Sequence, residues 1–358
     1  MKRLASHRSS VSTRADAGST AIAKWVNPVF VVGAARSGTT WVQCLACAGE
    51  GFFSCPETHF FDALLPQVTI GGGYQMHRPR YLPQNPHIDE DRLRGIIEKC
   101  TRGFLRVPSA AWTMLAAEAS AGTLRADVLL ESLVAACSPA DTVRRRWVEK
   151  TPIHASYLDH VFALFPDAKV VCVVRAPESV MQSAIRAFGV PASVVALDYW
   201  RSYRDVHLFL DSHPERQVDI AFIAYERLLN GDEELLVLSR FLGIDGTRPT
   251  QLRARAKSLF ERLYGETSLR NVQGGMYGSA PVAVPPPAAA SLLAAVLRRK
   301  LKLDIEPGCC TGNIHGFFAV PALIIDLARG IGHILWWRVI DTIQFMRARL
   351  RGKGLTNV

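Results

Sequence analysis

A glycine-framed loop near the start of the chain carries the first residues that could do chemistry. The segment Gly33-Ala-Ala-Arg-Ser-Gly-Thr-Thr40 has the G-x-x-x-x-G spacing of a phosphate-binding loop. The backbone N–H groups of such a turn, together with the start of the following helix, form a nest for an anion. Thr39 stands where a nucleotidase carries its lysine, and Arg36 supplies a positive charge earlier in the loop. The loop is therefore predicted to bind an anion without that lysine and without a required metal ion; the alternative is a tight turn of small residues.

A second group of polar residues follows a long apolar run much further along the chain. Arg175 comes directly after the run 168–174, and Pro177 opens a helical pattern that carries Ser183. Ligands of open α/β sheets bind outside the carboxyl ends of the strands, so Arg36 and Arg175 are predicted at one edge of a sheet. Two anion sites on one edge suit a ligand with two phosphate-like ends. Taken alone, Arg175 and Ser183 could equally be a surface arginine and a serine on a helix face.

These residues need a sheet to position them, and short apolar runs alternate with helical patterns along the chain. The runs predict strands at 28–33, 52–55, 146–150, 168–174 and 218–224, and helices at 38–48, 89–103, 108–119, 125–138, 154–165, 177–187 and 194–210. Strands that are apolar on both faces and alternate with helices predict an α/β fold with a parallel sheet covered on both faces. Residues 66–88, rich in glycine and proline, are predicted to leave the core.

Composition narrows the class of protein without choosing its ligand. Hydrophobic residues make up 49% of the 358 residues and charged residues 21%, which excludes wholesale disorder, collagen and coiled coil. The net charge of +10 indicates an anionic partner: a phosphorylated cofactor, a nucleic acid, an acidic glycan or a membrane surface. Cys44 and Cys47 form a C-x-x-C pair with no second pair at zinc spacing, so the cysteines are predicted to be reduced thiols. No metal site is predicted, and the vicinal pair Cys309 and Cys310 is assigned no role.

Three parts of the chain are distinguished by composition. We expect a disordered leader over 1–24, an α/β domain over 25–265, and a linker with a helical C-terminal extension over 266–358. No apolar run reaches the roughly 18 residues of a membrane span, and no export signal is recognised, so a cytoplasmic protein is expected. The amphipathic pattern over 317–351 leaves two alternatives: peripheral contact with the inner face of a membrane, or packing on the domain or a second subunit.

Several motifs also fall in the order found in a known family. VVGAARSGTTW (31–41) resembles the 5′-phosphosulfate loop of sulfotransferases, and VVRAPESVMQS (173–183) resembles their 3′-phosphate motif. Between them, CPETHFFD (55–62) and VEKTP (148–152) resemble segments of the Golgi-type heparan and tyrosyl-protein branch and its bacterial relatives. The resemblance covers residues 28–230. It implies a P-loop-like α/β fold and 3′-phosphoadenosine 5′-phosphosulfate (PAPS) as the sulfuryl donor, with no metal required.

The resemblance implies a set of donor-binding residues. Those of the two anion motifs, with two aromatic residues near the adenine, are Arg36, Ser37, Gly38, Thr39, Thr40, Trp41, Arg175, Ser183 and Tyr225. The chain departs from the family pattern at two places. Ala176 stands where the family usually has Asp or Asn, and Arg227 replaces the usual acid two residues after Tyr225. The first departure is expected to cost one capping interaction at the start of the following helix, and the second weakens the match at Tyr225.

Catalytic roles follow from the same resemblance. Glu57 matches the family's general base, and Arg36 and Lys150 would stabilise charge on the equatorial oxygens during in-line transfer. His59 is expected either to line the acceptor pocket or to pack beside the two phenylalanines that follow it. Without the motif, Glu57 could be a capping or surface carboxylate. Lys150 could be a solvated lysine or a partner of Glu149.

The predicted function is transfer of a sulfuryl group from PAPS to a hydroxyl, and secondarily an amine, of a carbohydrate, glycolipid or small-molecule acceptor. A P-loop kinase or NTPase is the first alternative, and the missing loop lysine argues against it. A non-catalytic polyanion-binding protein is the second, drawn from the net charge alone. No nucleic-acid motif is present, so no nucleic-acid partner is predicted.

Overall fold

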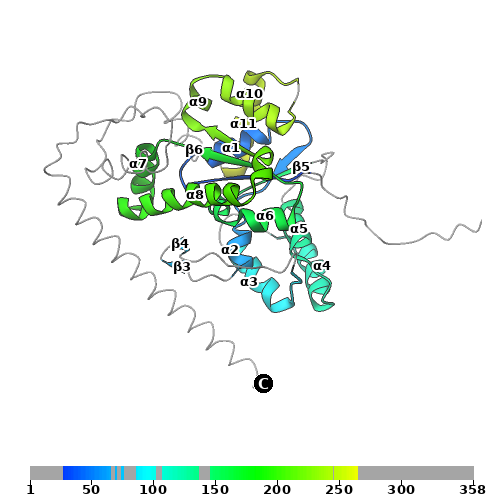
Figure 1. The fold of residues 1–358 in the computed structure, drawn as a ribbon. Helices are drawn as coiled ribbons and strands as arrows, with labels where there is room; N and C mark the ends of the chain where they lie inside the picture. The colour runs from blue at the N-terminus through cyan, green and yellow to red at the C-terminus, as the bar shows by residue number, and fades with distance from the viewer. Residues whose placement is uncertain are drawn as a thin grey trace, which may run out of the picture.

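A parallel sheet forms the centre of the protein in a computed structural model that describes residues 27–65, 69–70, 74–75, 86–101, 107–136, 146–244 and 246–264. Its five strands lie in the order β2 (Phe52–Ser54), β5 (Arg146–Lys150), β1 (Val29–Gly33), β6 (Lys169–Val174) and β7 (Ile220–Ala224). Every neighbouring pair is parallel, so the carboxyl ends of all five strands lie at one edge (Figure 1).

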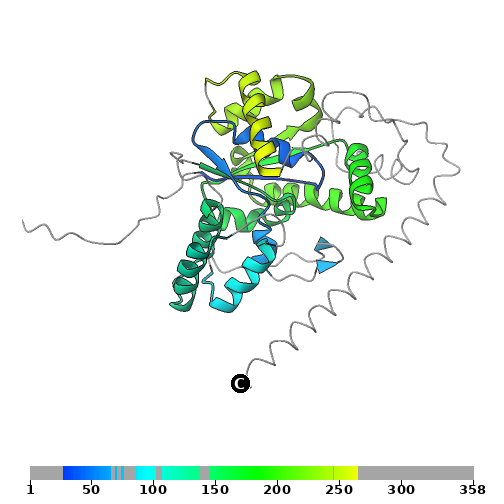
Figure 2. The ribbon, with the colours of Figure 1, turned by 180° about the vertical axis from the view of Figure 1, so that it is seen from behind.

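Helices cover both faces of this sheet (Figures 1 and 2). One face packs against α1 (Thr39–Ala46), α10 (Glu233–Leu242) and α11 (Pro249–Tyr264). The other packs against α6 (Leu158–Leu164), α8 (Ala192–Ser212) and the 3-10 helix η1 (Pro152–Tyr157). The predicted fold class, an α/β protein with a parallel sheet covered on both faces, is confirmed for the described residues.

The two-sided cover follows from the alternation of side chains along β1. Val29 and Val31 join the apolar cluster under α1, α10 and α11. Phe30 and Val32 join the cluster on the opposite face, and all four side chains are fully buried. A parallel strand buried on both faces is apolar at every position, which is why the run VFVVG is an unambiguous strand signal.

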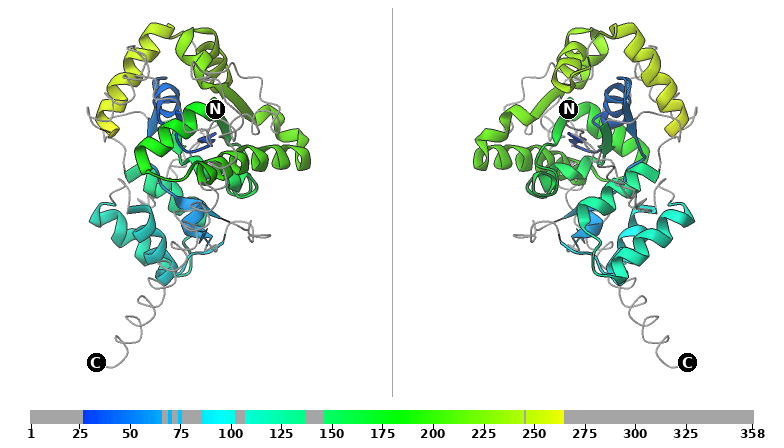
Figure 3. Two further views of the ribbon diagram at one scale, coloured as in Figure 1. Left: turned by 90° about the vertical axis from the view of Figure 1, so that its left-hand side faces the viewer. Right: turned by 90° about the vertical axis from the view of Figure 1, so that its right-hand side faces the viewer.

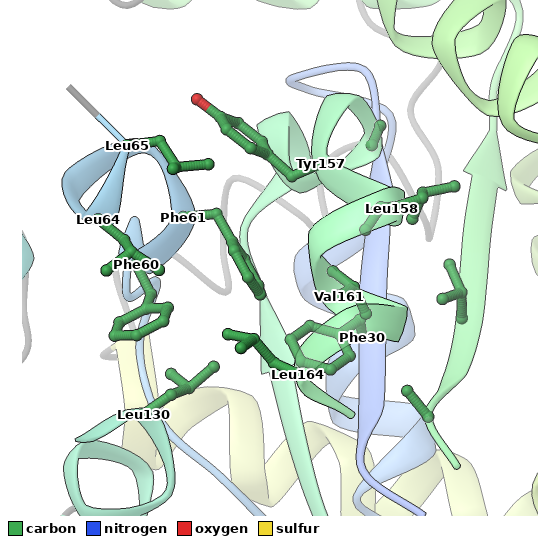
Figure 4. Close-up of a cluster of buried hydrophobic side chains, with 14 of the residues drawn as sticks. Phe30, Phe60, Phe61, Leu64, Leu65, Leu130, Tyr157, Leu158, Val161 and Leu164 are labelled. Atoms are coloured by element: carbon green, nitrogen blue, oxygen red, sulfur yellow. The ribbon is translucent and has the colours of Figure 1, made fainter. Parts of the chain in front are cut away.

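A further helical layer lies beyond the second face (Figure 3). It consists of α2 (Phe60–Leu64), α3 (Glu90–Thr101), α4 (Ser109–Ser120) and α5 (Ala126–Ala136), with a short antiparallel hairpin of β3 (Thr69–Ile70) and β4 (Tyr74–Gln75) nearby. The rings of Phe60 and Phe61 reach from α2 into the same core as Phe30 (Figure 4). Phe30 lies edge-on to Trp147, with ring centroids 5.3 Å apart.

The structure corrects the element predicted over 154–165. It forms the 3-10 helix η1 followed by α6, and not one continuous helix. Pro152 opens η1, and the His154 N–H donates to the Thr151 carbonyl three residues earlier at 2.9 Å. Such i to i−3 bonds tighten the chain relative to an α-helix. The predicted strand at 218–224 likewise begins later, at Ile220, because the 3-10 helix η2 (Pro214–Asp219) precedes it.

Three helices at the end of the domain lie in a segment where no helix was predicted. They are α9 (Tyr225–Asn230), α10 and α11. The signal in α11 is the spacing of Leu252, Ala256 and Phe260, one helical turn apart and all buried in the apolar cluster shared with α1. Their periodicity is visible in the sequence but is diluted by the many charged residues between them.

Some predictions fall on residues that the structure does not describe. These are the leader 1–24, the linker and extension 266–358 with the pattern over 317–351, and Cys137, Cys309 and Cys310. The cysteines inside the described ranges are free and buried, as predicted: Cys44, Cys47, Cys55, Cys100 and Cys172. No helix within the described ranges is long and apolar enough to cross a bilayer.

The packing around Phe30 predicts a large stability effect. Phe30→Ala removes a fully buried ring from the centre of the core and should lower the free energy of unfolding by about 3–5 kcal/mol. Val218→Ala shortens a side chain that is 74% exposed and should change the free energy of unfolding by less than about 0.5 kcal/mol. Urea denaturation of both variants measures the difference, and equal effects would show that the core is not centred on Phe30.

Candidate functional site

Each strand of the central sheet delivers one predicted site residue at its carboxyl end. Arg36 follows β1, Glu57 follows β2, Lys150 ends β5, Arg175 follows β6, and Tyr225 follows β7. Residues that are far apart in sequence therefore meet at one edge of the sheet. This edge is where open α/β sheets bind their ligands.

The loop after β1 depends on backbone conformations that favour glycine. Gly33 and Gly38 have φ angles of +142° and +94°, and Arg36 between them is left-handed at +70°. A Cβ on Gly38 would lie 2.2 Å from Cε2 of Tyr225, and one on Gly33 would lie 2.6 Å from the Val173 carbonyl oxygen. Only glycine fits at these two positions. The loop therefore packs directly on the Tyr225 ring and on β6.

The start of α1 presents unpaired donors inside this loop. Gly38 is the N-cap residue and no side chain caps the helix, so the first N–H groups, those of Thr39 and Thr40 included, have no acceptor within it. The Ser37 hydroxyl is fully buried and makes no hydrogen bond within the described part of the chain. A buried unpaired hydroxyl is costly, and an anion that brings acceptor oxygens would satisfy it.

Two arginines converge beside the loop. Arg36 Nε donates to Ser183 Oγ on α7 (Pro177–Phe188) at 3.2 Å, and Arg175 Nη1 donates to the Arg36 carbonyl at 3.0 Å. The Arg175 guanidinium also lies over the Tyr225 ring, 4.8 Å from its centroid. Burial and the neighbouring charge of Arg175 both lower the pKa of Arg36. Two like charges held this close would be stabilised by an anion placed between them.

No side chain caps α7, as the alanine at position 176 leads one to expect, and Glu226 instead binds the backbone beside it. Its Oε1 accepts the Ala176 N–H at 3.0 Å, at the N-cap position of α7. The same oxygen lies 3.9 Å from Nε of Arg175. The acid therefore satisfies the N–H of the N-cap residue and helps to orient the arginine.

Glu57 is held between two cationic side chains. The Lys150 side chain is only 1% exposed, and its Nζ pairs with Glu57 Oε1. On the other side, His59 Nε2 lies 3.3 Å from Glu57 Oε2. Burial acts to raise the pKa of Glu57, but the Lys150 charge and the hydrogen bonds from His59 and Lys150 bring it down to about 2. Glu57 is therefore ionised at neutral pH, as a proton acceptor must be.

His59 lies between two carboxylates. Its Nδ1 is 3.5 Å from Asp62 Oδ1, on the side away from Glu57. Burial acts to lower the pKa of His59, but hydrogen bonds and charges from Asp62 and Glu57 raise it to about 10. The side chain is 40% exposed and faces these acids, whereas the two following phenylalanines are fully buried. The proposed alternative pairing of Lys150 with Glu149 is not observed among the described contacts, because Glu149 pairs with His154.

Trp41 does not join this cluster. It is only 4% exposed and packs between α1 and α11, with its ring centroid 6.5 Å from that of Phe260. Tyr225 is therefore the predicted adenine contact that lies beside the loop. Within the described ranges, no three His, Cys, Asp or Glu side chains gather where they could hold a metal ion.

Two residues of the site environment were missed by sequence reasoning. Asp198 on α8 hydrogen-bonds the backbone of Ala35 in the loop, and burial raises its pKa to about 6. The Tyr264 ring lies 5.4 Å from Lys150 Nζ, and its hydroxyl donates to Gln43 Oε1 at 2.6 Å. Neither residue belongs to a local motif, so only tertiary packing reveals them.

The charges around His59 predict how stability depends on pH. Because folding raises the pKa of His59 from 6.5 to about 10, its stabilising effect is complete below pH 6.5 and is lost as the pH rises to about 10. His59→Asn is a matched variant, because asparagine tolerates the left-handed backbone of this position but carries no charge. Urea denaturation should show that raising the pH from 6 to 10 lowers the free energy of unfolding more in the unaltered protein than in His59→Asn. Parallel losses would contradict this assignment.

Among solved structures, the sulfotransferase domain of the Synechococcus PCC 7002 olefin synthase shares 21% identity at a TM-score of 0.45, covering 79% of this chain and 98% of that one. Sulfotransferase STF1 from Mycobacterium tuberculosis H37Rv shares 19% identity at a TM-score of 0.37, covering 67% of this chain and 77% of that one. Sulfotransferase STF9 from Mycobacterium avium shares 14% identity at a TM-score of 0.40, covering 78% of each chain. No curated protein sequence matches the chain. A sequence model of the Sulfotransferase family matches residues 28–247, more than half of the 358 residues, and the chain therefore belongs to that family.

Proposed function

We propose that this protein transfers a sulfuryl group from PAPS to an acceptor hydroxyl, with Glu57 as the general base. One observation carries the proposal: two basic anion sites and a base candidate meet at the same edge of the sheet. The first anion site is the loop with Arg36, and the second is Arg175 with Ser183. Beside them stands Glu57, ionised and paired with a lysine.

The residues present suit a donor with a phosphate-like group at each end. The unpaired N–H groups at the start of α1 and the buried Ser37 hydroxyl are donors for the 5′-phosphosulfate. In this proposal Arg175 and Ser183 bind the 3′-phosphate, and the Tyr225 ring borders the adenine; the contact of Arg175 with the loop and with that ring supports it. The adjacent charges of Arg36 and Arg175 favour an anion at this point.

PAPS supplies an activated sulfuryl group, and adenosine 3′,5′-bisphosphate leaves when the acceptor oxygen bonds to sulfur. Arg36, the loop N–H groups and Lys150 stabilise the charge that develops on the transferring oxygens. Glu57 accepts the proton of the acceptor hydroxyl. Because the charge of Lys150 helps to hold the pKa of Glu57 near 2, movement of Lys150 toward the reacting oxygens would make Glu57 a stronger base.

The acceptor we propose is a hydroxyl on a carbohydrate, glycolipid or small molecule, with an amine as the second choice. CPETHFFD and VEKTP support a carbohydrate, through their resemblance to the heparan and tyrosyl-protein branch. Phe188 adds an apolar surface beside the loop, because its ring is 61% exposed and lies 5.6 Å from the Arg36 guanidinium. A ring of this kind suits an acceptor that has an apolar face.

Donor recognition predicts a preference for the bisphosphate. Adenosine 3′,5′-bisphosphate should bind more tightly than AMP or ATP in calorimetric titration. Arg175→Ala should weaken its binding about 10- to 100-fold, the range of one hydrogen bond to a charged group. Arg216→Ala is the matched control, because this arginine lies at the opposite end of the strands, beside Asp219 before β7, and should leave binding unchanged. Tighter ATP binding, or equal affinity in Arg175→Ala, would contradict the proposed donor.

The role of Glu57 predicts a separation of binding from turnover. Glu57→Gln should bind adenosine 3′,5′-bisphosphate normally but lose about 10²- to 10⁴-fold in the rate at which PAPS is consumed. The rate can be followed as bisphosphate release, with water or a panel of sugars as acceptor. An unchanged rate in Glu57→Gln, with donor binding intact, would show that another group takes the proton.

A further inference from the structure

The turn that carries Glu57 and His59 has an unusual backbone. His59 adopts a left-handed conformation with φ of +51° although it is not glycine. Such a conformation persists only where the surrounding structure holds it, and it tends to occur at functional sites. The turn begins after β2 and ends in α2, a helix of five residues. Contacts outside the turn must therefore fix its shape.

Four successive backbone N–H groups of this turn each donate to a side chain. The four bonds are Thr58 N to Glu149 Oε1 (3.3 Å), His59 N to Thr151 Oγ1 (3.2 Å), Phe60 N to Thr58 Oγ1 (3.2 Å) and Phe61 N to His154 Nε2 (3.3 Å). Three of the four acceptors come from the segment that ends β5 and opens η1. The backbone is thus tied, residue by residue, to the neighbouring strand.

Glu149 is one of these four acceptors and holds the other three in place. Its Oε1 also accepts the hydroxyl hydrogens of Thr58 at 2.8 Å and Thr151 at 2.6 Å, and its Oε2 pairs with His154 Nδ1 at 2.9 Å. Because each threonine gives its only hydrogen to the carboxylate, its oxygen is left to accept a backbone N–H. Glu149, Thr58, Thr151 and His154 are fully buried, and we call them the Glu149 clamp.

The hydrogen positions in the clamp require a carboxylate. His154 Nε2 accepts the Phe61 N–H, so the imidazole proton resides on Nδ1 and is donated to Glu149. Every group around Glu149 is therefore a donor. Burial acts to raise the pKa of Glu149, but His154 and the two threonine hydroxyls hold it below its ordinary value.

The far end of the turn is fixed by packing. Phe60 and Phe61 are fully buried in the core beside Tyr157 and Leu164 (Figure 4). The Phe61 ring lies 5.0 Å from the His154 ring, so the clamp and the core meet at this residue. With both ends held, the carboxylate of Glu57 and the imidazole of His59 have a defined position at the site.

We propose that Glu149 is a positioning residue for sulfuryl transfer, whose buried carboxylate orders the Glu149 clamp and thereby aims Glu57 and His59 at the acceptor. The inference rests on the proposed role of Glu57 as the base. β5 then acts on Glu57 in two ways. Glu149 orders the backbone of the turn that carries Glu57, and the adjacent Lys150 pairs with its carboxylate directly. Glu149 itself touches neither donor nor acceptor in this proposal.

Glu149→Gln is a near-isosteric test, because an amide cannot satisfy the clamp in either orientation. If its oxygen faces the threonines, its NH₂ faces His154 Nδ1 and forces a proton onto Nε2, opposite the Phe61 N–H. If its oxygen faces His154, its NH₂ opposes the Thr58 N–H. One N–H of the turn loses its acceptor in both cases, so the turn should loosen while side-chain volume is unchanged.

The experiment measures transfer of the sulfuryl group from PAPS to water, so no natural acceptor is needed. In this reaction the bond from sulfur to the donor oxygen breaks, a bond to the water oxygen forms, and Glu57 takes the proton. Glu149→Gln should lower kcat about 10²-fold, the scale of a small misplacement of a reacting group. Its affinity for adenosine 3′,5′-bisphosphate should remain that of the unaltered protein.

A spectroscopic signal separates positioning from general loss of structure. In Glu149→Gln the pKa of His59, followed by NMR, should fall from about 10 toward its ordinary value of 6.5, as its contacts with Glu57 and Asp62 loosen. Leu115→Ala is the stability control, because it hollows the core under α4 and should leave both kcat and this pKa unchanged.

A second pair of variants covers the case in which Glu149→Gln does not fold. Thr151→Ser keeps the hydroxyl and should keep kcat, whereas Thr151→Val removes the acceptor of the His59 N–H and should lower kcat with bisphosphate affinity unchanged. Full kcat in Glu149→Gln or Thr151→Val would overturn the clamp while Glu57→Gln remains inactive. Full kcat in Glu57→Gln as well would instead overturn the proposed base.

Discussion

The ion pair between Lys150 and Glu57 is the interaction on which the rest of the site depends. A lysine that is almost completely buried is stable as a cation only beside an anion, so the core of the protein demands a carboxylate at this place. The sheet order meets that demand, because β5 lies between β2, which leads to Glu57, and β1, which leads to the anion loop. The order of the strands and the pairing of these two side chains are therefore linked.

From this pair an alternating series of charges runs outward from the sheet. Cations and anions alternate along this series, each in contact with the next: Lys150, Glu57, His59, Asp62 and Lys99. A carboxylate within such a series is ionised, and the cations beside it offset its charge. On the other side of the loop the balance is different, since Arg36 and Arg175 lie together and favour a bound anion. The two halves of the site therefore differ in charge balance, which fits the acceptor and the anionic donor that we propose.

The sequence alone predicts the parts of this arrangement that local pattern encodes. The apolar run of β6 and the glycine spacing of the loop place Arg36 and Arg175 at the same edge, as observed. The hydrogen bond from the Ala176 N–H to Glu226 could not be predicted, because it joins residues from separate strand ends. The position of Trp41 was also beyond local pattern, since an aromatic residue next to a binding loop can face either the ligand or the core. Long-range packing decides such cases.

The alternation of β5 has a consequence for how faithfully the chain folds. Glu149 and Lys150 are neighbours that point to opposite faces, one toward η1 and one toward Tyr264 on α11. Their register against β1 pairs Glu149 with Phe30 and Lys150 with Val31. A slip by one residue would turn both side chains to the opposite faces. Lys150 would then lose Glu57, and the Glu149 carboxylate would lose the hydrogen-bond donors around it. Misregistered pairing is therefore costly, and the two side chains that we propose prepare the site for chemistry also favour the correct register of the sheet.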